Sequence, residues 1–376
     1  MILCSRVLEW SLTGGILPVD PMRVETIGNR LRQVVSEVTR QEPIRVVYFG
    51  TPAFAVPALR ALHDDDRFDV VFVVTQPDRP AGRGRRLATS AVKSAALELD
   101  LPVYQPDRLR TEATRQPLVD AGADVFVVAA YGVIFGPRTL AIPSFGCLNL
   151  HASLLPAYRG ASPISAAIAG REAVTGVTLM QMETGLDTGP ILSMNAIDIL
   201  RSDTTESLTA RLATVGADLA TSLIPDWVDG QIKALPQPNE ATLTRPMTKA
   251  DGWLDWSRPA AELEAQVRAM WPWPRTWTTL ATSEGGSRIL QVHQVSLLDD
   301  IDRNPMDALG SVLDVPGRLI VATGNGSLEL VTVQEPGGRP IPGSVLISSG
   351  RLSPEGSLGE VGAPDVREPL VRPVED

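Results

Sequence analysis

The chain has 376 residues, of which 44% are hydrophobic and 21% charged, and it carries a formal net charge of −10. This length is sufficient for two domains, and the composition is that of a folded globular protein rather than a disordered one. The acidic balance excludes a protein that coats nucleic acid over its whole surface, because affinity for phosphates comes from clustered Lys and Arg. Any contact with nucleic acid must therefore be local.

Residues 1–43 are interpreted as an N-terminal extension that precedes the first strand. They lack the apolar core of a signal peptide, a helix is expected over Glu25–Thr39, and Met22 is an alternative start. The two cysteines, Cys4 and Cys147, predict no disulfide framework and a cytoplasmic location. Because no run of eighteen uncharged apolar residues occurs, no membrane partner is expected.

From residue 44 onward, apolar runs alternate with helical patterns. Ile44–Phe49 is a β-branched strand that ends at Gly50, and the apolar spacing after Pro52 suits a helix. Further strands are expected at Val70–Thr75, at Val103 and at Val125–Ala130, and a helix is expected over Ala91–Leu99. Buried strands separated by helices predict an α/β domain over 44–228, with a Rossmann-like, mostly parallel sheet and helices on both faces.

The next predicted strand, Gly146–Leu150, leads directly into a group of polar residues. A helix over Pro163–Ala169, a strand over Val174–Met182 and a helix near Glu206–Leu223 follow, and the Pro-containing segment 229–244 is interpreted as a linker. No Gly-x-Gly-x-x-Gly turn follows the first strand, which argues against a nicotinamide cofactor.

Residues 245–350 predict a second, smaller domain. A helix is expected over Ala260–Met270, and the short strands that follow, set off by Gly and Pro, are typical of a small OB-like β-barrel. Five tryptophans occur between Trp253 and Trp277, and packing at the domain junction is favoured over stacking on nucleotide bases. Residues 351–376 are expected to form a loose tail.

Three side chains suit acyl transfer to an amine, which passes through a tetrahedral oxyanion. Asn149 and His151 lie two residues apart at a strand end, and therefore on one face, while Asp187 lies in a later Gly-Leu-Asp-Thr-Gly turn. The amide and a protonated imidazole could donate to the oxyanion, and the carboxylate could orient the imidazole. Taken singly, Asn149 as a turn cap and His151 bonded to local backbone fit a structural role better than a catalytic one, and Asp187 fits a turn equally well.

These residues, with Ser153-Leu154-Leu155-Pro156 and Tyr158-Arg159-Gly160, resemble the 10-formyltetrahydrofolate-dependent formyltransferases. The resemblance extends from about Arg45 to about Ser348. It implies that Asn149, His151 and Asp187 are catalytic, that Ser153, Leu154, Leu155 and Pro156 contact the folate, and that 10-formyltetrahydrofolate is the co-substrate. The three histidines, His63, His151 and His293, lack the spacing of metal ligands, so no metal is expected.

A basic loop indicates the formyl acceptor. Arg79, Arg83, Arg85 and Arg86 face a single nearby acid, Asp78, and glycines let the backbone bend so that the guanidinium groups can reach phosphates. The segment resembles the branch of the family that formylates methionyl-tRNA. It implies that the loop binds initiator methionyl-tRNA, with the second domain as a further contact and a monomer as the expected state.

Two alternatives to this acceptor stay open at the level of sequence. One is formyl transfer to a small amine such as an amino sugar or a nucleotide, which would not need the arginine loop. The other is a non-catalytic folate- or RNA-binding protein that has kept the fold. The charge of the C-terminal part also departs from the family, which usually has a basic barrel facing tRNA. Residues 245–376 contain twelve Lys and Arg against eighteen Asp and Glu, so the residues of this part that contact tRNA are not assigned.

Overall fold

The computed structural model describes residues 42–81, 86–281, 287–298, 308–352, 357–359, 363–364 and 368–374. The expected N-terminal helix and the alternative start at Met22 lie outside these residues. The described chain is built around a seven-stranded sheet in the order β10-β9-β7-β6-β1-β2-β5. Its strands are β1 (Ile44–Gly50), β2 (Phe68–Val74), β5 (Val103–Tyr104), β6 (Val125–Ala129), β7 (Cys147–His151), β9 (Val174–Gln181) and β10 (Ile191–Asp198).

Five of these strands run parallel, from β7 through β6, β1 and β2 to β5, and the fold class predicted from the sequence is confirmed. The other two extend the sheet antiparallel, β9 against β7 and β10 against β9. Around the sheet lie a 3-10 turn and six helices: η1 (Ala53–Ala55), α2 (Val56–His63), α3 (Ala91–Glu98), α4 (Glu112–Asp120), α5 (Pro137–Leu140), α6 (Pro163–Ala169) and α7 (Thr205–Val228).

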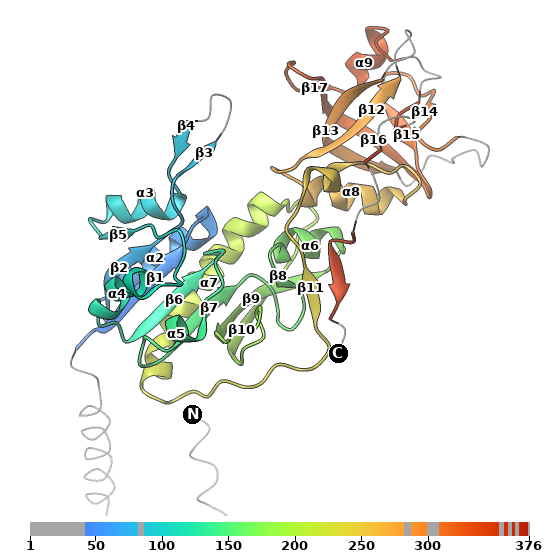
Figure 1. Cartoon of the computed structure of the whole chain (residues 1–376). Helices are drawn as coiled ribbons and strands as arrows, with labels where there is room; N and C mark the ends of the chain where they lie inside the picture. The colour runs from blue at the N-terminus through green and yellow to red at the C-terminus, as the bar shows by residue number, and fades with distance from the viewer. Residues whose placement is uncertain are drawn as a thin grey trace, which may run out of the picture. The chain divides into compact units, whose positions relative to one another are not determined.

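Helices cover both faces of the sheet (Figure 1). In β1, Val46 and Tyr48 enter the core beneath α2, α3 and α7, while Val47 and Phe49 enter the core on the side of α4 and α5. This division follows from the two-residue period of a strand. The near-continuous apolar strands of the sequence are thus buried on both sides, as parallel strands between helical layers must be.

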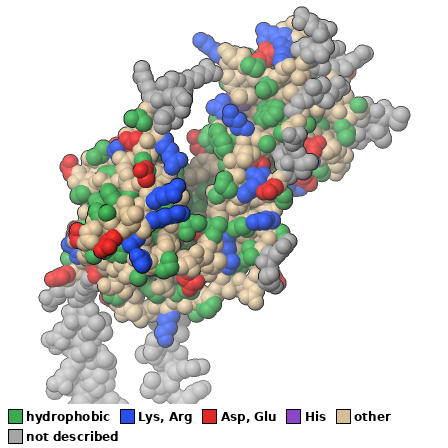
Figure 2. Space-filling model, viewed as in Figure 1, with side chains coloured by type: hydrophobic (Ala, Val, Ile, Leu, Met, Phe, Trp, Pro, Cys, Tyr) green, Lys and Arg blue, Asp and Glu red, His purple; other side chains and the backbone are tan. Residues whose placement is uncertain are grey.

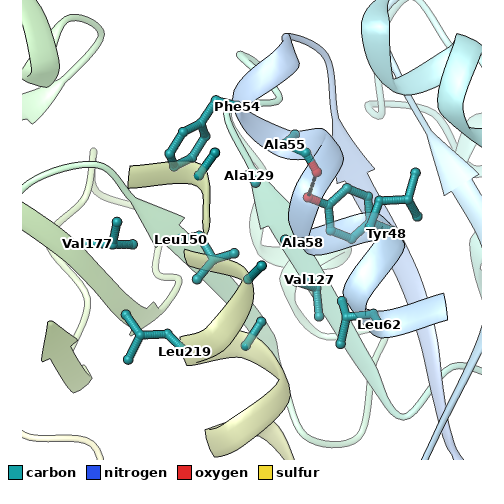
Figure 3. Packing of buried hydrophobic residues seen from close by; sticks show 14 of the residues in the cluster. Tyr48, Phe54, Ala55, Ala58, Leu62, Val127, Ala129, Leu150, Val177 and Leu219 are labelled. Carbon is teal, nitrogen blue, oxygen red and sulfur yellow. Dashed lines mark hydrogen bonds between the residues drawn. The ribbon is translucent and has the colours of Figure 1, made fainter. Parts of the chain in front are cut away.

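The larger core joins distant parts of the chain. Figure 3 shows Leu150 of β7, Val177 of β9 and Leu219 of α7 pointing toward one another. The hydroxyl of the fully buried Tyr48 donates to the carbonyl of Ala55 at 2.5 Å, so this polar group is not left unpaired in the core. The strand ends that carry the polar motif therefore rest on a well-packed base.

The second domain is a curled antiparallel sheet with its own hydrophobic core. Its elements are η2 (Lys249–Gly252), α8 (Ala260–Ala269), β12 (Thr276–Ala281), β13 (Ser287–Leu298), β14 (Val312–Leu313), β15 (Ile320–Ala322), β16 (Ser327–Gln334), β17 (Ile341–Pro342) and α9 (Ser344–Ser348). The order is β12-β13-β16-β15-β14, with β17 beside β16. Isolated bridges join Leu358 to Leu280 in β12 and Ser357 to Ser311, the residue before β14, so the tail pairs with both sides of the sheet.

The linker and the tail are more ordered than expected. Within the linker, β11 (Thr242–Thr244) pairs with β8 (Arg159–Gly160) on one side and with β18 (Val371–Pro373) on the other. The expectation of a loose tail was wrong for β18 and for the two bridged residues. Single-sequence patterns do not reveal such short strands, because pairing partners far away in the chain create them.

Candidate active site

Strand β7 presents two of the three predicted catalytic side chains. Asn149 and His151 lie at its carboxyl end, between the parallel neighbour β6 and the antiparallel neighbour β9. His151 is buried and Asn149 is half-buried. Polar groups at the carboxyl ends of strands in an open α/β sheet are placed where such folds bind their ligands.

Asp187 reaches these side chains from the loop between β9 and β10. Its Oδ2 accepts a hydrogen bond from the backbone N–H of Gly160 at 2.8 Å, and its Oδ1 lies 3.4 Å from Asn149 Nδ2. The distance from Oδ2 to His151 Nδ1 is 3.6 Å. The fold therefore brings Asn149, His151 and Asp187 together, although 36 positions separate the last two in sequence.

The hydrogen-bond partner of His151 indicates where its proton is held. Nε2 lies 2.9 Å from the carbonyl oxygen of Tyr158, which can only accept, so Nε2 carries a hydrogen. Nδ1 is left facing Asp187 at a distance longer than a hydrogen bond. Nδ1 is thus the ring atom available to take up or release a proton at the site.

The turn from Ser153 to Pro156 is built mainly by groups that point into the protein. The hydroxyl of Ser153 donates to the carbonyl of Ala157 at 2.6 Å, and the N–H of the buried Leu155 donates to Thr178 Oγ1 at 3.1 Å. The Leu155–Pro156 bond is cis. Of the four residues predicted to contact folate, Leu154 and Pro156 are half-buried and closer to the surface, whereas Ser153 and Leu155 hold the shape of the turn.

A second group of contacts, made by the linker, holds the backbone of the loop that carries Asp187. The side-chain amide of Gln237, in the linker, donates to the carbonyl oxygens of Asp187 and Gly189, each at 2.7 Å. Its oxygen accepts from the guanidinium of Arg159 at 2.7 and 3.1 Å. Burial lowers the pKa of Arg159, and the nearby Asp187 carboxylate acts in the opposite direction.

Beside this bridge lies a cavity of about 410 Å³. Arg159, Thr188 and Gln237 line it, together with Val374 from the tail. Residues of β8, of the loop that carries Asp187, of the linker and of the segment after β18 thus line one cavity.

Comparison with known proteins identifies the family. Residues 44–224 match the Formyl transferase family and residues 246–351 match the Formyl transferase, C-terminal domain family. The chain belongs to the formyl transferase family. Among its curated relatives, the methionyl-tRNA formyltransferase of Roseiflexus sp. (strain RS-1) is 42% identical over 85% of this chain and 97% of the relative. That of Pseudomonas paraeruginosa is 44% identical over 82% of this chain and 96% of the relative.

Solved structures share the formyl transferase fold at much lower identity. An N-formyltransferase from Helicobacter canadensis, in complex with folinic acid and dTDP-3-aminofucose, superposes with a TM-score of 0.55 at 16% identity, covering 76% of this chain and 98% of that one. HypX from Aquifex aeolicus in complex with tetrahydrofolic acid has a TM-score of 0.52 at 14% identity, covering 81% and 47% of the two chains. These likenesses establish the architecture.

In this formyl transferase, the described ends of the predicted basic loop form a two-stranded hairpin. β3 (Arg79–Ala81) pairs with β4 (Arg86–Ala88), and the side chain of Arg79 is exposed. Arg83 and Arg85, and the side chain of Arg86, lie outside the described residues. At the base of the hairpin, Asp78 accepts from Lys93 Nζ at 2.6 Å, which lowers the pKa of this carboxyl. Figure 2 shows Lys and Arg side chains gathered along a hollow in this face of the molecule.

The tryptophans near the domain junction mostly have protein partners. Trp253 and Trp277 meet edge to face at 4.8 Å, and the buried Trp256 donates to Thr278 Oγ1. Trp271 donates to Glu206 Oε2 in α7 at 3.1 Å, which links the second domain to the first. Packing, as expected, accounts for these four, and Trp273 is the exposed member of the group.

Neither a membrane-spanning helix nor a metal site is found in the part of the chain that the structure describes. No helix there is long and apolar enough to cross a membrane. No group of three or more His, Cys, Asp or Glu side chains is placed there to hold a metal ion.

Sequence reasoning missed two residues that shape the site. Gln237 lies in a segment without periodicity, and an isolated glutamine carries no signal of a role. Thr178 Oγ1 donates to the carbonyl of Ser153 at 2.7 Å, but in the sequence it is one residue of an apolar strand. Both contacts arise from tertiary pairing, and only the structure reveals them.

Proposed function

We propose that this formyl transferase moves the formyl group of 10-formyltetrahydrofolate to the α-amine of methionine esterified to initiator tRNA. The product is N-formylmethionyl-tRNA, which serves translation initiation. The acceptor is supported by the relatives named methionyl-tRNA formyltransferase, which are more than 40% identical over most of this chain. The folate donor is supported by the family and by the resemblance of the Ser153–Pro156 turn.

The observation that carries the chemistry is the convergence of an amide, an imidazole and a carboxylate at the end of β7. The uncharged amine attacks the formyl carbon, and the carbonyl electrons move to oxygen. Asn149 Nδ2 is placed to donate to this oxyanion, and His151 Nδ1 is placed to donate to it once it holds the proton taken from the attacking amine. An oxyanion is most stabilised by donors already in position. When the oxyanion collapses, the bond from carbon to the folate nitrogen breaks.

One proton must move during this transfer, from the attacking amine to the folate nitrogen that leaves. His151 Nδ1 is available for it, because Nε2 is held by the Tyr158 carbonyl. Asp187 Oδ2, at 3.6 Å, stabilises the imidazolium that forms and keeps the ring oriented. The Gly160 N–H fixes this carboxylate, so the relay needs no rearrangement of Asp187.

Formylation of methionyl-tRNA by purified variants tests the assignment. Asn149→Ala, His151→Ala and Asp187→Ala should each lower kcat by about 10²–10⁴-fold, the usual effect of removing an oxyanion donor or a proton-transfer group. Circular dichroism and melting curves check that each variant is folded. Near-normal turnover in all three folded variants would contradict the assignment.

The acceptor is tested separately by offering the wild-type protein charged initiator tRNA, charged elongator tRNA and free methionine. Formylation of the initiator tRNA alone is expected. The small-amine alternative is not favoured, since the N-formyltransferase solved in complex with dTDP-3-aminofucose is only 16% identical. The monomeric state and the cytoplasmic location stay predictions, and gel filtration with light scattering measures the first.

A further inference from the structure

The loop that carries Asp187 has a backbone conformation that needs support. Asp187 has φ 53°, in the left-handed region that residues other than glycine rarely adopt. Such a residue costs on the order of 1 kcal/mol relative to ordinary backbone. Contacts elsewhere must therefore hold the loop in place if its carboxylate is to face His151.

Those contacts come largely from one side chain. Both hydrogens of the Gln237 amide are used, one on the carbonyl of Asp187 and one on that of Gly189. Its oxygen is used as well, because Arg159 donates to it from two nitrogens. A guanidinium can only donate, so Arg159 fixes which end of the amide faces the loop.

The surroundings of Gln237 restrict its own movement. Prolines precede and follow it, at 236 and 238, and proline limits both its own backbone and that of the residue before it. Arg159, at the other end of the bridge, is the neighbour of Gly160, whose N–H binds the Asp187 carboxylate. The backbone and the side chain of Asp187 are thus held from the same short segment.

We propose that Gln237 is a positioning residue for formyl transfer, which acts by holding the Asp187–Gly189 backbone so that the Asp187 carboxylate faces His151. This inference rests on the proposed catalytic role of Asp187. Gln237 contributes no proton and makes no bond to the reacting atoms. The linker between the domains thereby supplies a part of the active site that neither predicted domain contains.

Three variants separate positioning from general stability. Gln237→Met keeps the length of the side chain and loses every hydrogen bond. Gln237→Glu keeps an oxygen that can accept from Arg159. It replaces the NH2 donor by a second carboxylate oxygen, which repels the carbonyl oxygens of Asp187 and Gly189. Gln231→Met is the matched control, since it makes the same change at an exposed glutamine of the same linker that does not line the cavity.

Formylation kinetics should show a loss in kcat, about 10–100-fold in Gln237→Met and larger in Gln237→Glu, with KM for both substrates nearly unchanged. In an Asp187→Ala background the Gln237→Met change should cost almost nothing more, because its effect passes through Asp187. Gln231→Met should behave as wild type. The proposal would be overturned if kcat of Gln237→Met stayed within about 2-fold of the wild-type value. It would also be overturned if adding Gln237→Met to Asp187→Ala lowered kcat by as much as it does in the wild-type protein.

A readout independent of activity is the amide proton of Gly160, observed by NMR in protein labelled with ¹⁵N-glycine. It should move upfield in Gln237→Met, as in Asp187→Ala, because its hydrogen bond to the carboxylate is weakened. An unchanged Gly160 resonance in Gln237→Met would refute positioning even if the wild-type protein failed to formylate methionyl-tRNA. That failure would refute the proposed acceptor and leave this measurement valid.

Discussion

No residue other than glycine fits at position 160. Its φ is +97°, and a Cβ at this position would lie 2.3 Å from the carbonyl oxygen of Thr244. Gly160→Ala should therefore separate β8 from β11 and withdraw the N–H from Asp187. We expect a loss of about 1–3 kcal/mol in the free energy of unfolding and at least a 10-fold loss in kcat.

Gly230→Ala is the matched control for this change. Gly230 also has a positive φ, +69°, but no atom lies within 4 Å of a Cβ built there. Its replacement should cost only the backbone strain, about 1–2 kcal/mol, and leave kcat unchanged. Urea denaturation and formylation assays on both variants measure the difference. Equal activity of the two variants would show that contact at Gly160 does not position the carboxylate.

Cys147 offers a pH prediction at the scale of a single group. Burial raises the pKa of its thiol from an ordinary 9.0 to about 12. In the folded protein at pH 8 it should therefore stay protonated and resist thiol reagents, which attack the thiolate. In a Cys4→Ser background, a chromogenic disulfide reagent should react at pH 8 only after denaturant is added. Rapid reaction in the native state would contradict this burial.

The same shift has a consequence for stability. Because the folded pKa lies above the unfolded one, the folded state holds this proton more tightly, so its contribution to stability falls as pH rises from about 9 toward 12. Below pH 9 the contribution is complete.

How far the sequence revealed the site differs from residue to residue. Asn149 and His151 were predicted together because a strand places residues i and i+2 on one face. Asp187 needed the family resemblance, since its sequence context is that of an ordinary turn. Gln237 could not be found, because its role depends on two carbonyls about fifty residues away that no local pattern describes.

Among the elements, the short strand β18 joins the C-terminal segment to β11, which pairs with β8. Its neighbour Leu370 accepts from the N–H of Arg245, and the N–H of Val374 donates to the carbonyl of Ala241. Removal of residues 368–376 should expose β11 on this side and lower the free energy of unfolding by about 1–3 kcal/mol, since each lost hydrogen bond contributes about 1 kcal/mol.

We expect kcat of the shortened protein to fall as well, because β11 supports β8 and thereby Gly160. Removing only residues 375–376 is the control, since that change leaves β18 in place. Melting curves and formylation assays compare the two with the full chain. A shortened protein as stable and active as the control would show that β18 contributes nothing to the site.

The elements that sequence patterns predicted are those whose own residues determine them. β6 is a continuous apolar run, and α7 begins with a capping box between Thr204 and Ser207. By contrast, α4 is polar and contains Pro117, and β10 is largely exposed at the sheet edge, so neither has a clear period. Their structure depends on neighbours in the fold, which explains why both were missed.

For the whole molecule, the distribution of charge decides how tRNA can be bound. The net charge is −10, yet the segment 79–86 contains four arginines, and the Asp78–Lys93 ion pair lies at the base of its hairpin. A long-range attraction spread over the surface is therefore not the expected mode. Binding should instead depend on a few phosphate contacts made by the hairpin, and its salt dependence should be correspondingly shallow.

Measuring the dissociation constant of charged initiator tRNA at several salt concentrations tests this view. Each phosphate contact adds about 0.7–0.9 to the slope of log K against log salt, so replacing Arg79, Arg83, Arg85 and Arg86 by Gln should lower the slope by about 3. Arg318→Gln is the control, because this guanidinium is paired with Glu329 in the second domain. An unchanged slope in the fourfold variant would place the phosphate contacts elsewhere, and a slope reduced by Arg318→Gln would move them to the second domain.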